Sequence, residues 1–125
     1  MIGGDFRSGC PIASTLDLIG DRWTLVLLRD LMNGKARFKE FLESPERISS
    51  NILSARLVAM EDAGLIESRL YQRRPKRREY KLTRSGAGLL PVLQAICCWG
   101  EAELPDRWPA PATFMTRTPE DLMKK

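Results

Sequence analysis

The spacing of apolar residues changes period in the middle of this 125-residue chain, and the change limits the folds open to it. Up to Gly64, apolar residues recur at helical spacing. From Ile66 to Gln72, and again from Glu79 to Leu82, neighbouring positions alternate as they do along a β-strand. The two runs flank a turn that contains a proline, so they predict a β-hairpin. Helices followed by one hairpin predict a mainly helical α+β chain with the architecture of a winged helix-turn-helix.

The turn of the predicted hairpin is strongly basic. Residues 73–78 hold five positive charges, contributed by Arg73, Arg74, Lys76, Arg77 and Arg78. The window from Glu67 to Arg84 contains eight basic and two acidic residues, a net of +6, while the whole chain carries +4. Charge gathered on one hairpin is typical of a protein that contacts the phosphates of double-stranded DNA, along the backbone or in the minor groove. The alternative is a run of charges that serves solubility alone.

The helix predicted over residues 49–63 comes just before the hairpin. Leu53, Leu57 and Met60 form a narrow apolar stripe that must face the core. The opposite side holds mostly short side chains, and such a helix can enter the major groove and reach base edges. An ordinary solvated face is the alternative. The residues predicted to contact DNA are Arg37, Ser49, Ser50, Asn51, Ser54, Arg56, Arg73, Arg74, Lys76, Arg77 and Arg78.

Shorter helices are predicted upstream. One begins at a cap made by Ser14 and ends at Gly20, and Asp21 caps the next, which ends at Gly34. Residues 35–37 form a brief connector or a minimal strand. A two-turn helix with Phe38, Phe41 and Leu42 on one face then ends at Ser44-Pro45.

A long final helix is predicted from Thr83 to about Leu104, with a bend at Pro91. Its apolar stripe is too wide for one small domain to cover, which predicts a symmetric homodimer with two reading helices about one turn of DNA apart. The alternative is a helix that only closes the monomer core. The expected dimer contacts are Leu89, Leu93, Ile96, Cys97 and Trp99. The domain predicted over residues 10–104 follows a flexible arm, residues 1–9, and precedes a Pro-rich tail, residues 105–125, that is expected to be extended.

Composition excludes several function classes. The chain has no histidine, so Ser-His-Asp catalysis, Cys-His catalysis and histidine-containing zinc sites are excluded within it. Its three cysteines form no CxxC pair, and no GxGxxG or P-loop motif is present. We therefore expect no enzyme activity, no cofactor and no metal. No membrane span or signal peptide is visible, so a cytoplasmic location is expected.

Several segments resemble the HxlR-type regulators, a family of bacterial winged-helix transcription factors. The resemblance starts at Cys10-Pro11-Ile12 and at residues 16–24, which read LDLIGDRWT. It continues through Arg37-Phe38, Ile48-Ser49 with Asn51, Leu53-Ser54 with Arg56-Leu57, residues 63–66 (AGLI), residues 79–83 (EYKLT), Gly86, and residues 89–93 (LLPVL) with Trp99-Gly100. It covers about residues 10–104 and implies a homodimeric DNA-binding activator or repressor.

The resemblance also implies a role for Cys10. Some HxlR-type proteins sense oxidants or electrophiles through a cysteine at this N-terminal position, which makes Cys10 a candidate redox sensor and a small electrophile a candidate effector. The site is chemically suitable, because a helix N-terminus and nearby Arg7 would favour the thiolate. The alternative is a small buried hydrophobe under the dimer interface.

Two functions from different classes remain. The first is a dimeric, sequence-specific DNA-binding regulator, with thiol sensing as a refinement. The second is a winged helix that binds a protein or RNA and does not read duplex DNA.

Overall fold

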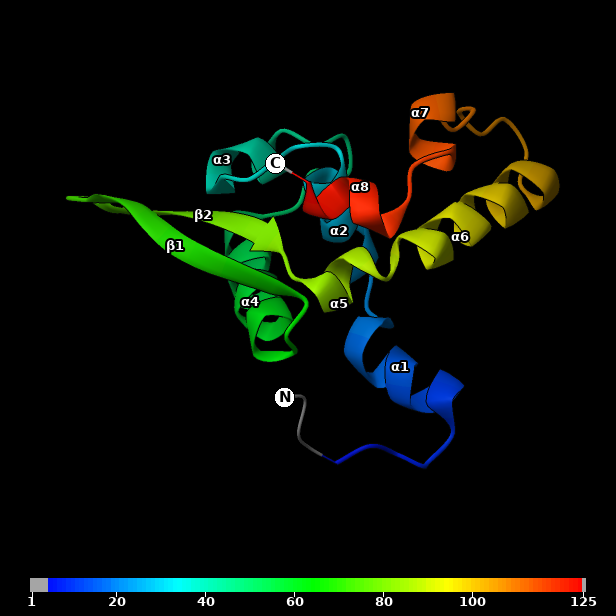
Figure 1. Cartoon of the computed structure of the whole chain (residues 1–125), viewed down its shortest axis with the longest axis horizontal. Coiled ribbons are helices and arrows are strands. Elements are labelled where there is room, and N and C mark those ends of the chain that lie inside the picture. Colours follow the sequence, from blue (N-terminus) through cyan, green and yellow to red (C-terminus); the bar gives the residue numbers. More distant parts are fainter. Residues whose placement is uncertain (1–4, 125) are drawn as a thin grey trace.

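The computed structural model describes residues 5–124, so residues 1–4 of the predicted arm lie outside the described residues. The elements are α1 (Pro11–Ile19), α2 (Thr24–Met32), α3 (Phe38–Leu42), α4 (Ser50–Asp62), β1 (Ile66–Arg73), β2 (Lys76–Leu82), α5 (Arg84–Ala87), α6 (Leu90–Glu103), α7 (Ala112–Met115) and α8 (Pro119–Met123). The tip of the hairpin projects away from the helices, while α1 and α6 lie towards the other end of the molecule (Figure 1). This order confirms the predicted mainly helical winged helix-turn-helix.

The helix boundaries follow from local capping. The N-cap position of α2 is Trp23 and not Asp21 as predicted, but the Asp21 carboxylate accepts hydrogen bonds from the backbone N–H groups of Trp23 and Thr24 at 2.9 and 3.0 Å, in the turn that leads into the helix. Gly34, just past the end of α2, has φ of +101°, a conformation that glycine adopts without strain. The predicted cap at Ser14 is wrong. α1 already begins at Pro11, whose fixed φ and missing N–H suit the first turn of a helix.

The hairpin is anchored by a third short segment. β1 and β2 pair antiparallel from Ile66↔Leu82 at the base to Arg73↔Lys76 at the tip. The backbone N–H of Tyr80 donates to the carbonyl of Ala36 at 2.7 Å, and Arg37 forms a bridge with Glu79. Residues 35–37, predicted as a brief connector or a minimal strand, form a connector with one isolated bridge at Arg37, and this bridge ties the hairpin to the start of α3.

The core lies under α4, between α2, α3 and the base of the hairpin. Leu53, Leu57 and Met60 are buried, which confirms the predicted inward stripe of α4. Phe41 of α3 is fully buried and packs edge-on against Tyr80, with ring centroids 6.3 Å apart. This packing fixes the outward face of α4 relative to the hairpin.

The region after the hairpin differs from the prediction. The long helix is divided into α5 and α6, because the ring of Pro91 would clash with the carbonyl of Ala87 in a continuous helix. The tail is not extended throughout, since it contains α7 and α8. Phe114 is buried, and the side-chain amide of Gln94 donates to the carbonyls of Phe114 and Arg117 at 3.0 and 2.8 Å. These tertiary contacts fold a segment whose prolines favour extended chain.

Candidate nucleic-acid interface

The outward face of α4 carries the predicted reading residues. Ser50, Asn51 and Ser54 are exposed, in the first turns of the helix. Ser49 caps α4, with its hydroxyl oxygen accepting the N–H of Ile52 at 3.2 Å, so the hydroxyl proton is left to donate to another acceptor. Ile52 is also exposed. Ile52 was not among the predicted contacts, and only its position next to Asn51 in the helix could have indicated that it is exposed. An apolar side chain at this position suits contact with a thymine methyl group.

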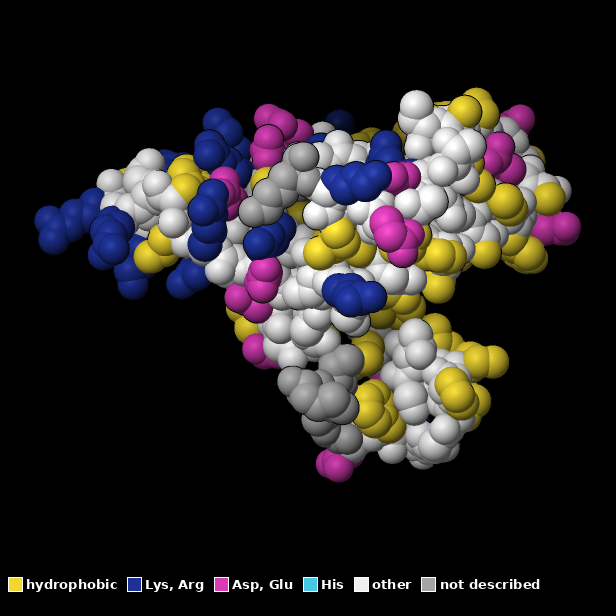
Figure 2. All heavy atoms as spheres, viewed as in Figure 1, with side chains coloured by type: hydrophobic (Ala, Val, Ile, Leu, Met, Phe, Trp, Pro, Cys, Tyr) yellow, Lys and Arg dark blue, Asp and Glu magenta, His cyan; other side chains and the backbone are white. Residues whose placement is uncertain are grey.

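The tip of the hairpin is a cluster of free cations. Arg73, Arg74, Lys76 and Arg77 are exposed and form no ion pair with any residue between 5 and 124. Arg78, also exposed, donates to the hydroxyl of Ser68 at 3.2 Å. Figure 2 shows Lys and Arg side chains gathered around this end of the molecule. The unpaired charge leaves the tip ready to bind an anion.

Charge is balanced at the base of the hairpin. Arg69 donates to Glu79 at 2.8 Å, and this hydrogen bond holds the pKa of Glu79 below its usual value, so the carboxylate stays charged. Arg37 lies 3.6 Å from the same carboxylate, and its guanidinium stacks over the ring of Tyr71 at 3.8 Å. Arg37 is therefore held in place by the hairpin, with its exposed edge towards solvent.

Ser54, on the outward face of α4, lines the same groove as part of the cationic tip. This groove has a volume of about 480 Å³ and lies between the start of α3, the middle of α4 and the hairpin. Its lining includes Ser54 of α4 and Lys76, Arg77 and Arg78 of the hairpin, with Arg37 between them. Lys39 of α3 also lines it and was not among the predicted contacts. A single bound strand can therefore touch the helix and the wing together.

Arg56 has a different surrounding from the other predicted contacts. It is partly buried, and its guanidinium lies 3.6 Å from Asp21. Although burial opposes ionisation, hydrogen bonds from Thr24 and from backbone N–H groups hold the pKa of Asp21 below its usual value. The pair fastens α4 to the start of α2, so Arg56 stabilises the position of the reading helix.

Comparison with known proteins agrees with this geometry. The family described as HxlR-like helix-turn-helix matches residues 18–107. The chain belongs to the HxlR family. It is 38% identical to the uncharacterized HTH-type transcriptional regulator YdeP of Bacillus subtilis, over 80% of this chain and 81% of the relative.

Two solved structures of regulators have a similar fold. The oxidized form of the redox regulator HypR is 34% identical, covers 75% of this chain and 97% of that chain, and has a TM-score of 0.67. The reduced form of the transcriptional regulator YodB from B. subtilis is 30% identical, covers 81% of this chain and 100% of that chain, and has a TM-score of 0.65. The family and the relatives identify this chain as a DNA-binding transcriptional regulator. This is the class of protein that the sequence predicted.

The predicted dimer residues of this HxlR-type chain fall into three groups by exposure. Ile96 and Trp99 of α6 are exposed, with 63% of Trp99 accessible, whereas Leu89 and Cys97 are partly buried. Leu93 is buried in the core of its own chain, so it cannot present its side chain to a partner as predicted. Leu93 belongs to the buried core cluster that includes Leu28 of α2 and Phe114 of the tail.

α1 adds apolar surface that periodicity did not single out. Ile12 and Leu16 are exposed, and Ile19 is the only buried residue of the helix. Hydrophobic side chains cover much of the visible surface of α1 and α6 (Figure 2). A helix that buries so little of its apolar surface within its own chain is suited to packing against another protein.

The cysteines of the HxlR-type chain differ in accessibility. Cys10 is exposed at the start of α1, while the guanidinium of Arg7 is paired with Asp17 and does not contact the thiol as its sequence position suggested. Burial, reinforced by Glu101, raises the pKa of the Cys97 thiol, which therefore stays neutral. Cys98 is exposed on α6.

Two further observations concern the described part of the chain. No helix within residues 5–124 is long and apolar enough to cross a membrane. The same residues contain no cluster of three or more His, Cys, Asp or Glu side chains suited to a metal ion.

Proposed function

We propose that this HxlR-type chain is a cytoplasmic, homodimeric regulator that reads a specific DNA sequence with α4 and holds the duplex with its wing. The observation that carries the proposal is the shared groove, in which Ser54 of α4 lies opposite Lys76, Arg77 and Arg78. If the reading helix and the cationic tip faced different sides, one duplex could not engage both. Their common orientation supports a single docking geometry.

The two parts have different tasks in this proposal. The wing arginines approach phosphates or the minor groove and supply affinity that does not depend on sequence. Asn51 and Ser54 approach base edges in the major groove, where an amide and a hydroxyl can each donate and accept hydrogen bonds. Arg37 and Lys39, at the edge of the groove, add contacts to the backbone.

A dimer is the assembly that best accounts for the apolar surface. Trp99 and Ile96 on α6, with Ile12 and Leu16 on α1, are large apolar side chains left exposed by the monomer. Burial of these side chains against a second copy removes that surface from water. A twofold dimer then presents two α4 helices to two half-sites about one turn of DNA apart.

Thiol sensing is proposed as a refinement through Cys10. The exposed thiol at the start of α1 lies next to the apolar face assigned to the dimer, so its modification would alter subunit contacts. The redox regulator HypR, with reduced and oxidized forms, is a relative at about a third identity, which supports this role. We expect diamide or quinone to change DNA binding of the wild type and of Cys98→Ser, but not of Cys10→Ser. A full response in Cys10→Ser would remove Cys10 as the sensor.

The decisive experiment compares two duplexes. Fluorescence anisotropy is measured with DNA from upstream of the protein's own coding sequence and with an unrelated duplex of equal length, at 50 and 200 mM salt. We expect tighter binding to the upstream duplex at both salts, with each affinity falling steeply as salt rises. Equal affinities for the two duplexes at both salts would reject specific readout and favour the role in protein or RNA binding.

A further inference from the structure

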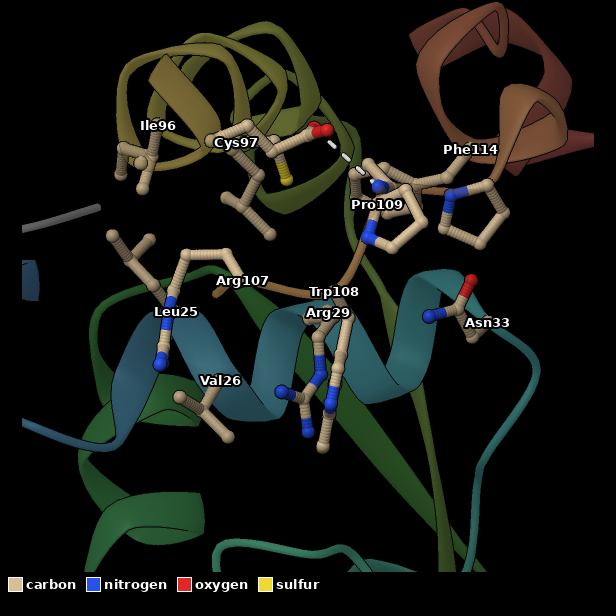
Figure 3. Close-up of a pocket in the computed structure, with 15 residues that line it drawn as sticks. Leu25, Val26, Arg29, Asn33, Ile96, Cys97, Arg107, Trp108, Pro109 and Phe114 are labelled. Carbon is tan, nitrogen blue, oxygen red and sulfur yellow. Dashed lines mark hydrogen bonds between the residues drawn. The ribbon is translucent and has the colours of Figure 1, made fainter. Parts of the chain in front are cut away.

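An apolar pocket that is partly open to solvent, called the cavity below, lies between the tail of this chain and its helical body. It has a volume of about 400 Å³ and lies between α2, α6 and residues 107–114 of the tail. Leu25 and Val26 of α2 face Ile96 and Cys97 of α6 across it, and Trp108 and Pro109 border it from the tail (Figure 3). The lining is almost entirely apolar. Most of the covering segment lies beyond the HxlR match, which ends at residue 107.

The tail covers the cavity without filling it. Its far end is anchored, because Phe114 is buried and Gln94 donates to the carbonyls of Phe114 and Arg117. Over the cavity the attachment is weaker: the N–H of Ala110 donates to Glu101 at 3.4 Å, a long hydrogen bond. The indole of Trp108 borders the cavity while 79% of that residue stays exposed. A segment held at one end and loosely attached at its middle can admit a ligand.

The residues that line the cavity determine which class of ligand can bind there. An apolar space of this size offers water few hydrogen-bond partners, so an apolar molecule is a better occupant than water. Of the charged groups at the edge, Arg29 is fully engaged, because it holds Glu46 with two hydrogen bonds of 2.7 Å. Arg107 donates only its Nε–H, to the carbonyl of Pro105 at 2.9 Å, and Glu101 accepts only the bond from Ala110. The exposed lining is nevertheless almost wholly apolar, so it offers a charged ligand little solvation. The site therefore fits an uncharged molecule with an aromatic or aliphatic body of one or two rings.

The cavity is also connected to the reading helix. Arg29 lines the cavity on α2, and Glu46, its partner, lies in the turn that leads from α3 to α4. Asp30, the next residue of α2, is buried and accepts the hydroxyl of Ser44 in the same turn. Arg29 therefore links the cavity to the turn before α4 through its pair with Glu46. On its other side, the cavity touches Ile96 of the proposed dimer helix.

We propose that this cavity is an effector site for an uncharged, mainly apolar small molecule, and that its occupation changes the affinity of the protein for DNA. The second half rests on the proposed function, whereas the first half does not. Gly100 of α6 lines the cavity, and a Cβ atom added there meets nothing within 4 Å. A Cβ atom therefore has room at this lining position, and we expect a leucine there to take up part of the cavity.

The first experiment uses no DNA. The probe is N-phenyl-1-naphthylamine, an uncharged fluorophore with two aromatic groups, titrated into full-length protein. We expect saturable binding of one probe per chain, weakened about tenfold or more in Gly100→Leu because leucine occupies the same space. Ala102→Leu, on an exposed position of the same helix outside the lining, should bind as the wild type does. Energy transfer to the probe should fall in Trp108→Phe, which checks the location of binding independently of Gly100→Leu.

The outcomes separate the two halves of the proposal. Absence of saturable binding, or equal binding by Gly100→Leu and wild type, would reject the site. If Gly100→Leu also prevented dimer formation and the probe bound only the monomer, the cavity would belong to a second copy, and the proposal would be wrong. DNA affinity measured with and without saturating probe should change in the wild type and not in Gly100→Leu. An unchanged affinity would reject the effector role, while failure to bind DNA at all would reject the proposed function and leave the site standing.

Discussion

Removal of the wing arginines should weaken binding to every duplex by a calculable amount. Arg73, Arg74 and Arg77 form no ion pair within residues 5–124, and Arg78 has only a hydroxyl partner, so all four are available to phosphates. Each arginine that neutralises one phosphate adds about 0.9 to the slope of log affinity against log salt. Replacement of all four with alanine should therefore reduce the slope by up to about 3.6 per bound chain. Between 50 and 200 mM salt, the wild type should lose about a hundredfold more affinity than the variant for each bound chain, or on the order of 10⁴-fold more for a dimer that engages both wings.

Anisotropy titrations of one arbitrary 30-base-pair duplex at several salt concentrations measure this slope, because the effect does not require the specific site. Arg107→Ala is the control, since Arg107 lies in the tail, away from the groove shared by α4 and the wing. It should leave the slope nearly unchanged. If the control lowered the slope as much per charge as the wing variant did, net charge would explain the binding, and the contacts assigned to the wing would be wrong.

Three further predictions concern stability and assembly. The hydrogen bond from Arg29 holds the pKa of Glu46 below its usual value, so the contribution of Glu46 to folding is present above about pH 4 and is lost as the pH falls through the folded-state pKa. Glu46→Gln should lower the free energy of unfolding by about 1 kcal/mol at pH 7 and by nearly nothing at pH 3 in urea titrations; an equal loss at both values would contradict this. Gly86→Ala should cost about 3 kcal/mol or more, because its Cβ would lie 2.0 Å from the backbone oxygen of Leu65, while Gly100→Ala should be neutral or slightly stabilising. Similar melting temperatures for the two variants would refute this close contact between α5 and the start of the hairpin. Trp99→Glu should convert the dimer to a monomer in sedimentation equilibrium, and an unchanged mass would place the interface elsewhere.

Local signals in the sequence identified the features that position the site. The inward stripe of α4 was predictable because Leu53, Leu57 and Met60 repeat at helical spacing, and a buried stripe determines which residues face outward. The hairpin was predictable because its alternation and its basic turn are contiguous in the chain. Minor differences arise where two local rules compete, as at α1, where Pro11 sets the start of the helix ahead of the capping serine.

Features that depend on distant residues were not predictable. Nothing around Phe114 indicates that it is buried, because its contacts come from α2 and α6, brought close only in the folded chain. The pairing of Arg29 with Glu46 joins residues 17 positions apart, in elements whose relative placement periodicity does not define. The cavity beside the tail was not predictable for the same reason, because its lining residues come from segments far apart in the sequence. Leu93 belongs to the apolar stripe of α6, and only its packing shows that it faces inward.

The central claim is that α4 determines which DNA sequence is bound, while the wing supplies affinity for any duplex. Its most direct test is selection from a pool of randomised duplexes by the wild type, by Asn51→Ala/Ser54→Ala and by the variant lacking the four wing arginines. We predict that the wild type enriches a symmetric motif, that the wing variant enriches the same motif with lower yield, and that the helix variant enriches a different or degenerate one. A wing variant that changes the motif, beside a helix variant that preserves it, would contradict the account.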